Sequence, residues 1–135
     1  MADAAVIARR TQAKVLCNFE IYLWLSKQGV DNIQPMNHGG TARVEGCAAK
    51  MVNAVHSSSL PDGSYGGNPC GWLVESAEGS FYYAGDTALT MDMKIIGETT
   101  RLRFAALPIG DTFTMGVDDA IKAADWVGCS TVLGL

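Results

Sequence analysis

Residues 1–30 show two hydrophobic patterns in succession, one with helical spacing and one typical of a buried strand. Apolar residues follow Asp3 at helical spacing, which predicts a helix over residues 3–10 with Asp3 as its N-cap. The segment KVLCNF is rich in β-branched and aromatic residues and indicates a buried strand. Residues 20–27 return to a broad apolar helical face, and Gly29 lies where helices commonly end. The pattern therefore predicts helix, strand, helix.

Residues 32–87 have a different pattern, in which short extended segments are separated by glycine-containing turns. The predicted strands are IQPM, TARVEG, AAKMVNAV, CGWLVES and SFYYAGD. A loop rich in Gly, Ser and Pro separates the third strand from the fourth over residues 57–69. The last two strands are joined by Ala77-Glu78-Gly79, which is typical of a β-hairpin with a glycine in its turn.

Residues 91–135 return to an alternation of helices and strands. We predict a helix over residues 91–98, a strand buried on both faces in LRFAALPIG, a helix over residues 116–127 and a final strand in STVLGL. One face of the last helix gathers apolar residues, namely Val117, Ala120, Ile121, Ala124 and Val127. The whole pattern predicts one α/β domain over residues 1–135, with mixed sheets flanked by helices.

The composition fits one globular domain and excludes several classes of function. The chain has 135 residues, of which 48% are hydrophobic and 18% charged. The net charge is −4 and the ten Lys and Arg are scattered, so we expect no nucleic-acid partner. There is no signal-peptide core and no run near the roughly 20 apolar residues that span a bilayer, so we expect a cytoplasmic protein without a membrane partner. The four cysteines are widely spaced, which predicts reduced core thiols.

Only two histidines, His38 and His56, are available for metal binding or acid–base chemistry. His56 follows the strand AAKMVNAV and precedes three serines, so its ring is expected at a strand end, where catalytic groups often lie. The alternative is a partly exposed histidine that is hydrogen-bonded to those serine hydroxyls. Taken alone, the sequence favours this alternative over a metal ligand.

Asp86 is the stronger candidate, because it ends the apolar run FYYAGD. Gly85 permits a tight backbone turn before it, and Thr87 lies within reach of its carboxylate. A buried carboxylate is costly unless it is paired or bound to a metal, which makes an aspartate at a strand end informative. An N-cap for the segment after Thr87 is an equally good interpretation.

Two other segments are less informative about chemistry. YGGNP, residues 65–69, lacks the Lys-Ser/Thr pair of a phosphate-binding loop and is interpreted as a structured loop. LPIGDTFTMG offers Asp111, Thr112 and Thr114, which we interpret as a lead into the last helix with Thr114 or Asp118 as cap. The sequence has no G-x-S-x-G elbow, and no cysteine has a histidine beside it, so nucleophilic catalysis by a side chain has no support.

Five segments, in this order and at these intervals, carry a resemblance to a known family: VHSSS, YGGNPCGW, YYAGDT, DMKIIGE and LPIGDTFTMG. The chain resembles uncharacterised metal-dependent hydrolases of the metallo-β-lactamase superfamily, relatives of the ascorbate-phosphate lactonases. The resemblance runs through nearly all 135 residues. It implies an αββα sandwich and a dinuclear zinc or manganese site at the strand ends, with metal-bound hydroxide as nucleophile.

The resemblance also implies roles for individual residues. His56 matches the third histidine of the first metal site, and Asp86 matches the catalytic carboxylate that bridges the two metals. His38 is not at a ligand position of the family. The family's H-x-H-x-D-H motif would precede Met1 and its last histidine would follow Leu135, so five ligands are expected outside this chain. We therefore expect an internal fragment that lacks the first strands and the C-terminal end of the fold.

Two hypotheses of function follow. The first is a metal-dependent hydrolase of an ester, lactone or phosphate-bearing small molecule, inactive or nearly so as this chain because only His56 and Asp86 remain as ligands. The second is a non-catalytic binding or assembly domain that forms homo-oligomers through exposed sheet edges and binds a small ligand beneath YGGNP. A metal site completed by another chain is a third possibility.

Overall fold

The computed structural model describes residues 2–135. Its N-terminal part is a small unit of two helices and two strands. Its elements are α1 (Ala2–Thr11), β1 (Val15–Cys17), α2 (Phe19–Lys27) and β2 (Ile33–Pro35). β1 and β2 pair in parallel, and their register joins Leu16 to Gln34. The two helices pack on this pair through a small core that includes Ala5, Cys17 and Leu25.

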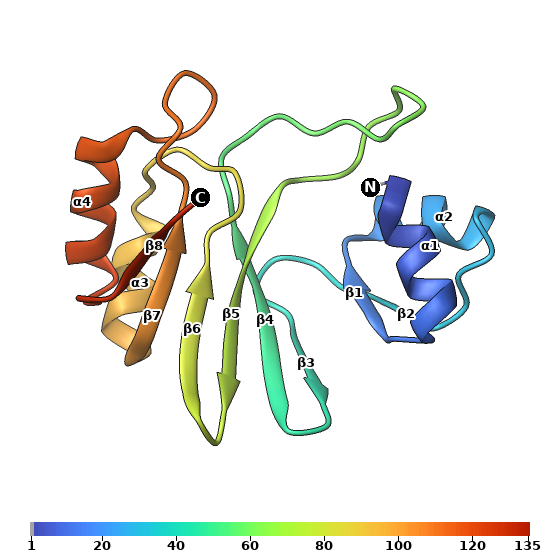
Figure 1. Ribbon diagram of the computed structural model, residues 1–135, viewed down its shortest axis with the longest axis horizontal. Helices are drawn as coiled ribbons and strands as arrows, with labels where there is room; N and C mark the ends of the chain where they lie inside the picture. The colour runs from blue at the N-terminus through green and yellow to red at the C-terminus, as the bar shows by residue number, and fades with distance from the viewer. Residues whose placement is uncertain (1) are drawn as a thin grey trace.

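The rest of the chain forms a six-stranded mixed sheet with the order β3-β4-β5-β6-β7-β8. The strands are β3 (Thr41–Val44), β4 (Cys47–Asn53), β5 (Cys70–Ser76), β6 (Gly79–Tyr83), β7 (Leu102–Leu107) and β8 (Val132–Gly134). β3 to β6 pair antiparallel, and β7 and β8 follow β6 in parallel. The carboxyl ends of β4, β6, β7 and β8 therefore lie at the same edge of the sheet, the upper edge in Figure 1.

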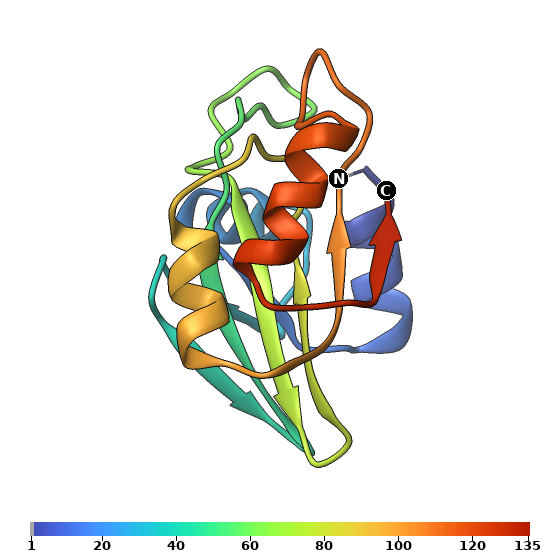
Figure 2. The same ribbon diagram turned by 90° about the vertical axis from the view of Figure 1, so that its left-hand side faces the viewer.

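Two further helices, α3 (Asp92–Thr99) and α4 (Val117–Trp126), cover one face of this sheet (Figure 2). The main core lies between them and the strands and is centred on fully buried Tyr82, Met93, Leu107 and Val127. The opposite face of the sheet is turned toward β1 and β2, with α1 and α2 outermost (Figure 1). The layers are therefore helices, sheet, sheet and helices, which confirms the predicted mixed α/β class and the αββα arrangement.

The predicted elements are all present, with differences at their ends. α1 begins at Ala2, so Asp3 lies in its first turn and is not an N-cap as predicted. β7 is not buried along its whole length, because Arg103 is exposed and donates from Nη1 to the Glu78 carbonyl oxygen at 2.6 Å. The hairpin is confirmed: Ser76 pairs with Gly79 around a two-residue turn. None of the helices within residues 2–135 is long and apolar enough to cross a membrane.

The buried face of α4 matches the prediction in part. Ala120 and Val127 are buried and Ala124 packs against the core, as predicted, and Ala123 is buried as well. Val117 and Ile121, which were predicted on this face, are more than half exposed. The prediction placed the large residues Val117 and Ile121 on the buried face because they fit the helical spacing. In the structure α4 lies close to the sheet, so the small alanine side chains face it instead. Gly116 is the N-cap without a side-chain bond, so the interpretation of Thr114 or Asp118 as cap is wrong.

Substitution of Ile121 by glutamine should leave the free energy of unfolding within about 0.5 kcal/mol of the parent value, because the side chain is 59% exposed. Val127→Ala, in the core below the same helix, should cost about 2 kcal/mol through lost burial and a residual cavity. Urea unfolding of both variants checks this. A large loss for Ile121→Gln would mean that a second molecule covers this face in solution.

Candidate functional site

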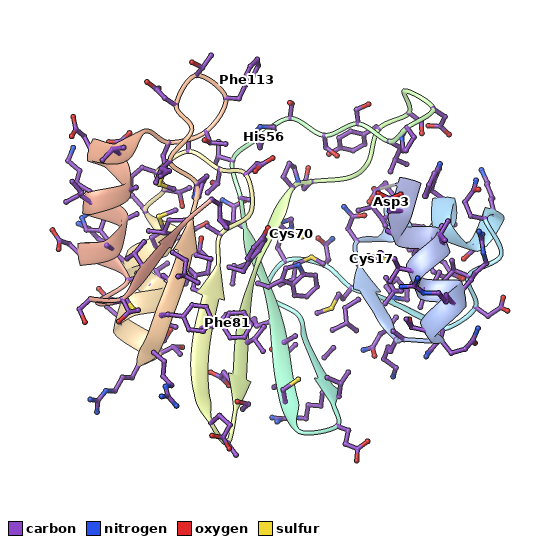
Figure 3. All side chains as sticks on the ribbon, viewed as in Figure 1. Asp3, Cys17, His56, Cys70, Phe81 and Phe113 are labelled. Atoms are coloured by element: carbon purple, nitrogen blue, oxygen red, sulfur yellow. The ribbon has the colours of Figure 1, made fainter. Side chains whose placement is uncertain are left out.

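The two candidate site residues lie at the carboxyl ends of neighbouring parts of the sheet. His56 follows β4 and Asp86 follows β6, and both line one pocket of about 250 Å³ at the upper edge of the sheet. The remaining lining comes from the start of α2, from the loop over residues 57–69 that runs across the pocket and from the first residue of β5, namely Asn18, Ile21, Ser57, Ser58, Gly66, Asn68, Pro69 and Cys70. Figure 3 shows His56 at this edge of the sheet. The fold thus brings together two residues that are 30 positions apart in the sequence.

His56 is half-buried, and its ring is oriented by the backbone. Its Nδ1 atom lies 2.8 Å from the Ser57 carbonyl oxygen. A carbonyl oxygen only accepts, so Nδ1 carries the proton and the lone pair of the neutral ring is on Nε2. The expected hydrogen bond to serine hydroxyls is therefore replaced by one to a carbonyl oxygen. Orientation of one ring nitrogen by a carbonyl is also the usual arrangement of histidines whose other nitrogen binds a metal.

Asp86 reaches the pocket through a turn that requires glycine before it. Gly85 has φ +66°, and a Cβ atom there would lie 2.9 Å from the Cys70 carbonyl oxygen, so the predicted role of Gly85 is confirmed. Asp86 itself is exposed, which removes the argument from the cost of a buried carboxylate. The capping interpretation is also wrong, because the next helix begins at Asp92 with Met91 as N-cap.

Thr87 is buried and does not bond the Asp86 carboxylate as expected. Its hydroxyl accepts from the Val55 N–H at 2.9 Å and donates to the Ala88 carbonyl oxygen at 2.8 Å. The hydroxyl is therefore committed to the backbone, and it connects the segment that carries Asp86 to the segment that carries His56.

Asn18 is the site residue that the sequence interpretation missed. It is 5% exposed, and its Oδ1 accepts from the Ile21 N–H at 2.9 Å, which makes it the N-cap of α2. Its Nδ2 donates to the Gly66 carbonyl oxygen at 2.7 Å, across the gap between the N-terminal unit and the loop above the pocket. An asparagine directly before a helical pattern is an N-cap signal, but Asn18 was assigned to the strand KVLCNF.

The other polar candidates do not line the pocket. His38 borders a separate groove beneath α3, and its Nε2 contacts the Pro69 carbonyl oxygen at 2.8 Å. Asp111 and Thr112 have positive φ angles of 60° and 57° in the loop before α4 and are absent from the lining of the pocket. YGGNP is a structured loop, as predicted, since Gly66 and Asn68 are both bonded to Asn18.

Two thiols lie behind the pocket, between the sheets (Figure 3). Burial raises the pKa of Cys17 to about 11, with a smaller contribution from Cys70, and burial also raises the pKa of Cys70. Both groups are protonated at neutral pH, whereas a thiol must lose its proton to act as a nucleophile or a metal ligand. Cys70 therefore lines the pocket with an uncharged thiol. All four cysteines are free, as predicted.

The donor set of the chain does not complete a metal centre. The His56 Nε2 atom and the Asp86 carboxylate are donor types that zinc and manganese accept. A catalytic zinc site ordinarily has three protein ligands, and no group of three His, Cys, Asp or Glu side chains within residues 2–135 is arranged to hold a metal ion. The chain contributes two candidate ligands, which is fewer than such a site requires.

The layered fold and the polar pocket at the strand ends define a metallo-hydrolase type of α/β domain. The family model described as the β-lactamase superfamily domain matches residues 1–135, and the chain belongs to this family. Its relatives include metal-dependent hydrolases of the UPF0173 group, which implies a divalent metal in the family.

Three similar proteins illustrate the relation. A UPF0173 metal-dependent hydrolase of Methylacidiphilum infernorum is 56% identical over 135 residues, which is 100% of this chain and 60% of that protein. One of Thermus thermophilus is 53% identical over 111 residues, 82% of this chain and 49% of that protein. The solved structure of Igni18, a metallo hydrolase from Ignicoccus hospitalis, has a TM-score of 0.84 at 33% identity and covers 98% of this chain and 56% of that one. The chain thus spans 49–60% of the length of the curated relatives that it matches.

Proposed function

We propose that this chain is part of a metal-dependent hydrolase that cleaves an ester, lactone or phosphate-bearing small molecule, and that His56 and Asp86 are two ligands of its dinuclear zinc or manganese centre. The carrying observation is that both residues line the same pocket at the strand ends in a chain of this family. The free lone pair of the His56 ring supports the assignment. Because the chain holds two donors, it should bind metal weakly and be inactive or nearly so by itself.

Zinc titration of the purified chain, followed by calorimetry, tests the ligand assignment. We expect weak binding that His56→Ala and Asp86→Ala each abolish, since one remaining donor cannot hold the ion. His38→Ala is the control for the loss of a histidine, because His38 does not line this pocket and touches it only through the Pro69 carbonyl oxygen. Equal zinc binding by the parent chain and both pocket variants would contradict the assignment. Hydrolysis that survives in His56→Ala would contradict the proposed role in catalysis.

The same samples distinguish the proposal from a non-catalytic assembly domain. β8 is an edge strand with exposed side chains, which supports self-association through its free edge. A stable oligomer that holds no metal and is indifferent to chelator would favour the assembly domain. Metal uptake that rises with protein concentration would instead favour a centre completed by a second chain.

A further inference from the structure

Two polar residues, Asn18 and Thr87, are buried among the residues that the structure describes, and both are hydrogen-bonded at the candidate pocket. Asn18 donates to the Gly66 carbonyl oxygen in the loop above the pocket. Thr87 is completely inaccessible to solvent at 0% exposure and lies inside the edge of the sheet from which His56 and Asp86 extend. Burial of a hydroxyl is unfavourable unless it is hydrogen-bonded, so the partners of Thr87 indicate what it stabilises.

Thr87 joins three segments that are distant in the sequence. Its hydroxyl accepts from the Val55 N–H at 2.9 Å, next to His56. In return, the Ala88 N–H donates to the Val55 carbonyl oxygen at 3.1 Å. The Thr87 carbonyl oxygen accepts from the Met115 N–H at 2.9 Å, in the loop that follows β7. The segments that follow β4, β6 and β7 are thus joined to one another at Thr87.

The position of this junction relates it directly to the pocket. The hydrogen bond joins the Val55 N–H to the Thr87 hydroxyl. His56 follows Val55 and Asp86 precedes Thr87, so each candidate ligand is adjacent in the sequence to one of the two bonded residues. β4 and β6 are not adjacent, since β5 lies between them. Ladder hydrogen bonds therefore do not connect the two strands directly, and the Thr87 hydroxyl makes the connection just beyond their ends.

We propose that Thr87 is a positioning residue that sets the separation and orientation of His56 and Asp86. The proposal rests on the proposed function, because the separation of these side chains matters through their joint binding of metal. Valine has nearly the shape of threonine but can neither accept from Val55 nor donate to Ala88, whereas serine keeps the hydroxyl. The pair Thr87→Val and Thr87→Ser therefore separates the hydrogen bonds from the packing.

The test uses zinc affinity together with a measurement that needs no metal. We expect Thr87→Val to weaken zinc binding by about tenfold or more, as is usual for groups that orient metal ligands. Thr87→Ser should restore an affinity close to that of the parent chain. In metal-free protein, ¹⁵N shifts of the His56 ring should report the Nδ1–H tautomer in the parent and in Thr87→Ser, and a mixture of tautomers in Thr87→Val.

Val127→Ala is the control for a loss of stability alone, because Val127 belongs to the main core and does not line the pocket. It should leave the zinc affinity and the ring shifts unchanged. If Thr87→Val behaves like Val127→Ala in both measurements, the positioning role is wrong. If the parent chain binds no zinc, the ligand assignment is wrong. The tautomer of His56 in metal-free Thr87→Val then tests by itself whether Thr87 orients the His56 ring.

Discussion

Gly97→Ala should lower the free energy of unfolding by about 2 kcal/mol or more, although alanine normally stabilises a helix by roughly 1 kcal/mol relative to glycine. Gly97 lies inside α3, where the helix crosses the end of α4. A Cβ atom at this position would press on the Trp126 carbonyl oxygen and lie 2.9 Å from the Val127 carbonyl carbon. These are backbone atoms, so the added methyl group forces the two helices apart.

Urea unfolding of Gly97→Ala beside Glu98→Ala checks this expectation. Glu98 is exposed on the same helix, so its replacement should change the stability by less than about 0.5 kcal/mol. Separation of the helices should also weaken the stacking of the Lys94 ammonium over the Trp126 ring, now 4.7 Å from the ring centroid, and change the tryptophan fluorescence. A stabilised Gly97→Ala variant would show that α3 and α4 do not approach this closely in solution.

The order of elements was predictable from the sequence because each element carries its own local signal. Short apolar runs bounded by glycine turns gave β4 to β7, and Gly29 marked the end of α2, where its φ is +73°. The buried face of α4 was predictable only in part: Ala120 and Val127 are buried as predicted, but Val117 and Ile121 fit a helical stripe equally well and are exposed. Which residues lie inside depends on how closely the neighbouring sheet approaches, and this distance is a tertiary property.

The candidate site was predictable only in part, for a similar reason. His56 and Asp86 follow strands, and strand ends are recognisable locally. The polar interactions that hold them are long-range: Thr87 bonds a residue 32 positions away, and Asn18 bonds one 48 positions away. Threonine after aspartate suggested a bond to the nearest acceptor, the Asp86 carboxylate. The buried hydroxyl instead bonds two backbone groups, the Val55 N–H and the Ala88 carbonyl oxygen.

Asn18→Ala should destabilise the protein by about 2–4 kcal/mol, because the substitution removes two kinds of interaction at once. One is the N-cap of α2, in which Oδ1 accepts from the Ile21 N–H. The other is the bond from Nδ2 to the Gly66 carbonyl oxygen, which leaves a backbone acceptor without its partner in a buried place. The loss should therefore exceed the roughly 1 kcal/mol that a helix cap contributes on its own.

Asn18→Ser separates the two contributions, because serine caps a helix but cannot reach Gly66 with a donor. We expect Asn18→Ser to unfold at an intermediate urea concentration and to share with Asn18→Ala a faster amide hydrogen exchange over residues 57–69.

Gly67→Ala is the reciprocal variant: Gly67 has φ +80°, and a Cβ atom there would press on the Asn18 side-chain amide. It should loosen the same loop while the N-cap residue itself is unchanged. Parent-like exchange over this loop in both Asn18 variants would show that the contact between α2 and the loop does not hold the loop in place, whereas faster exchange in both would assign that role to the Asn18 amide.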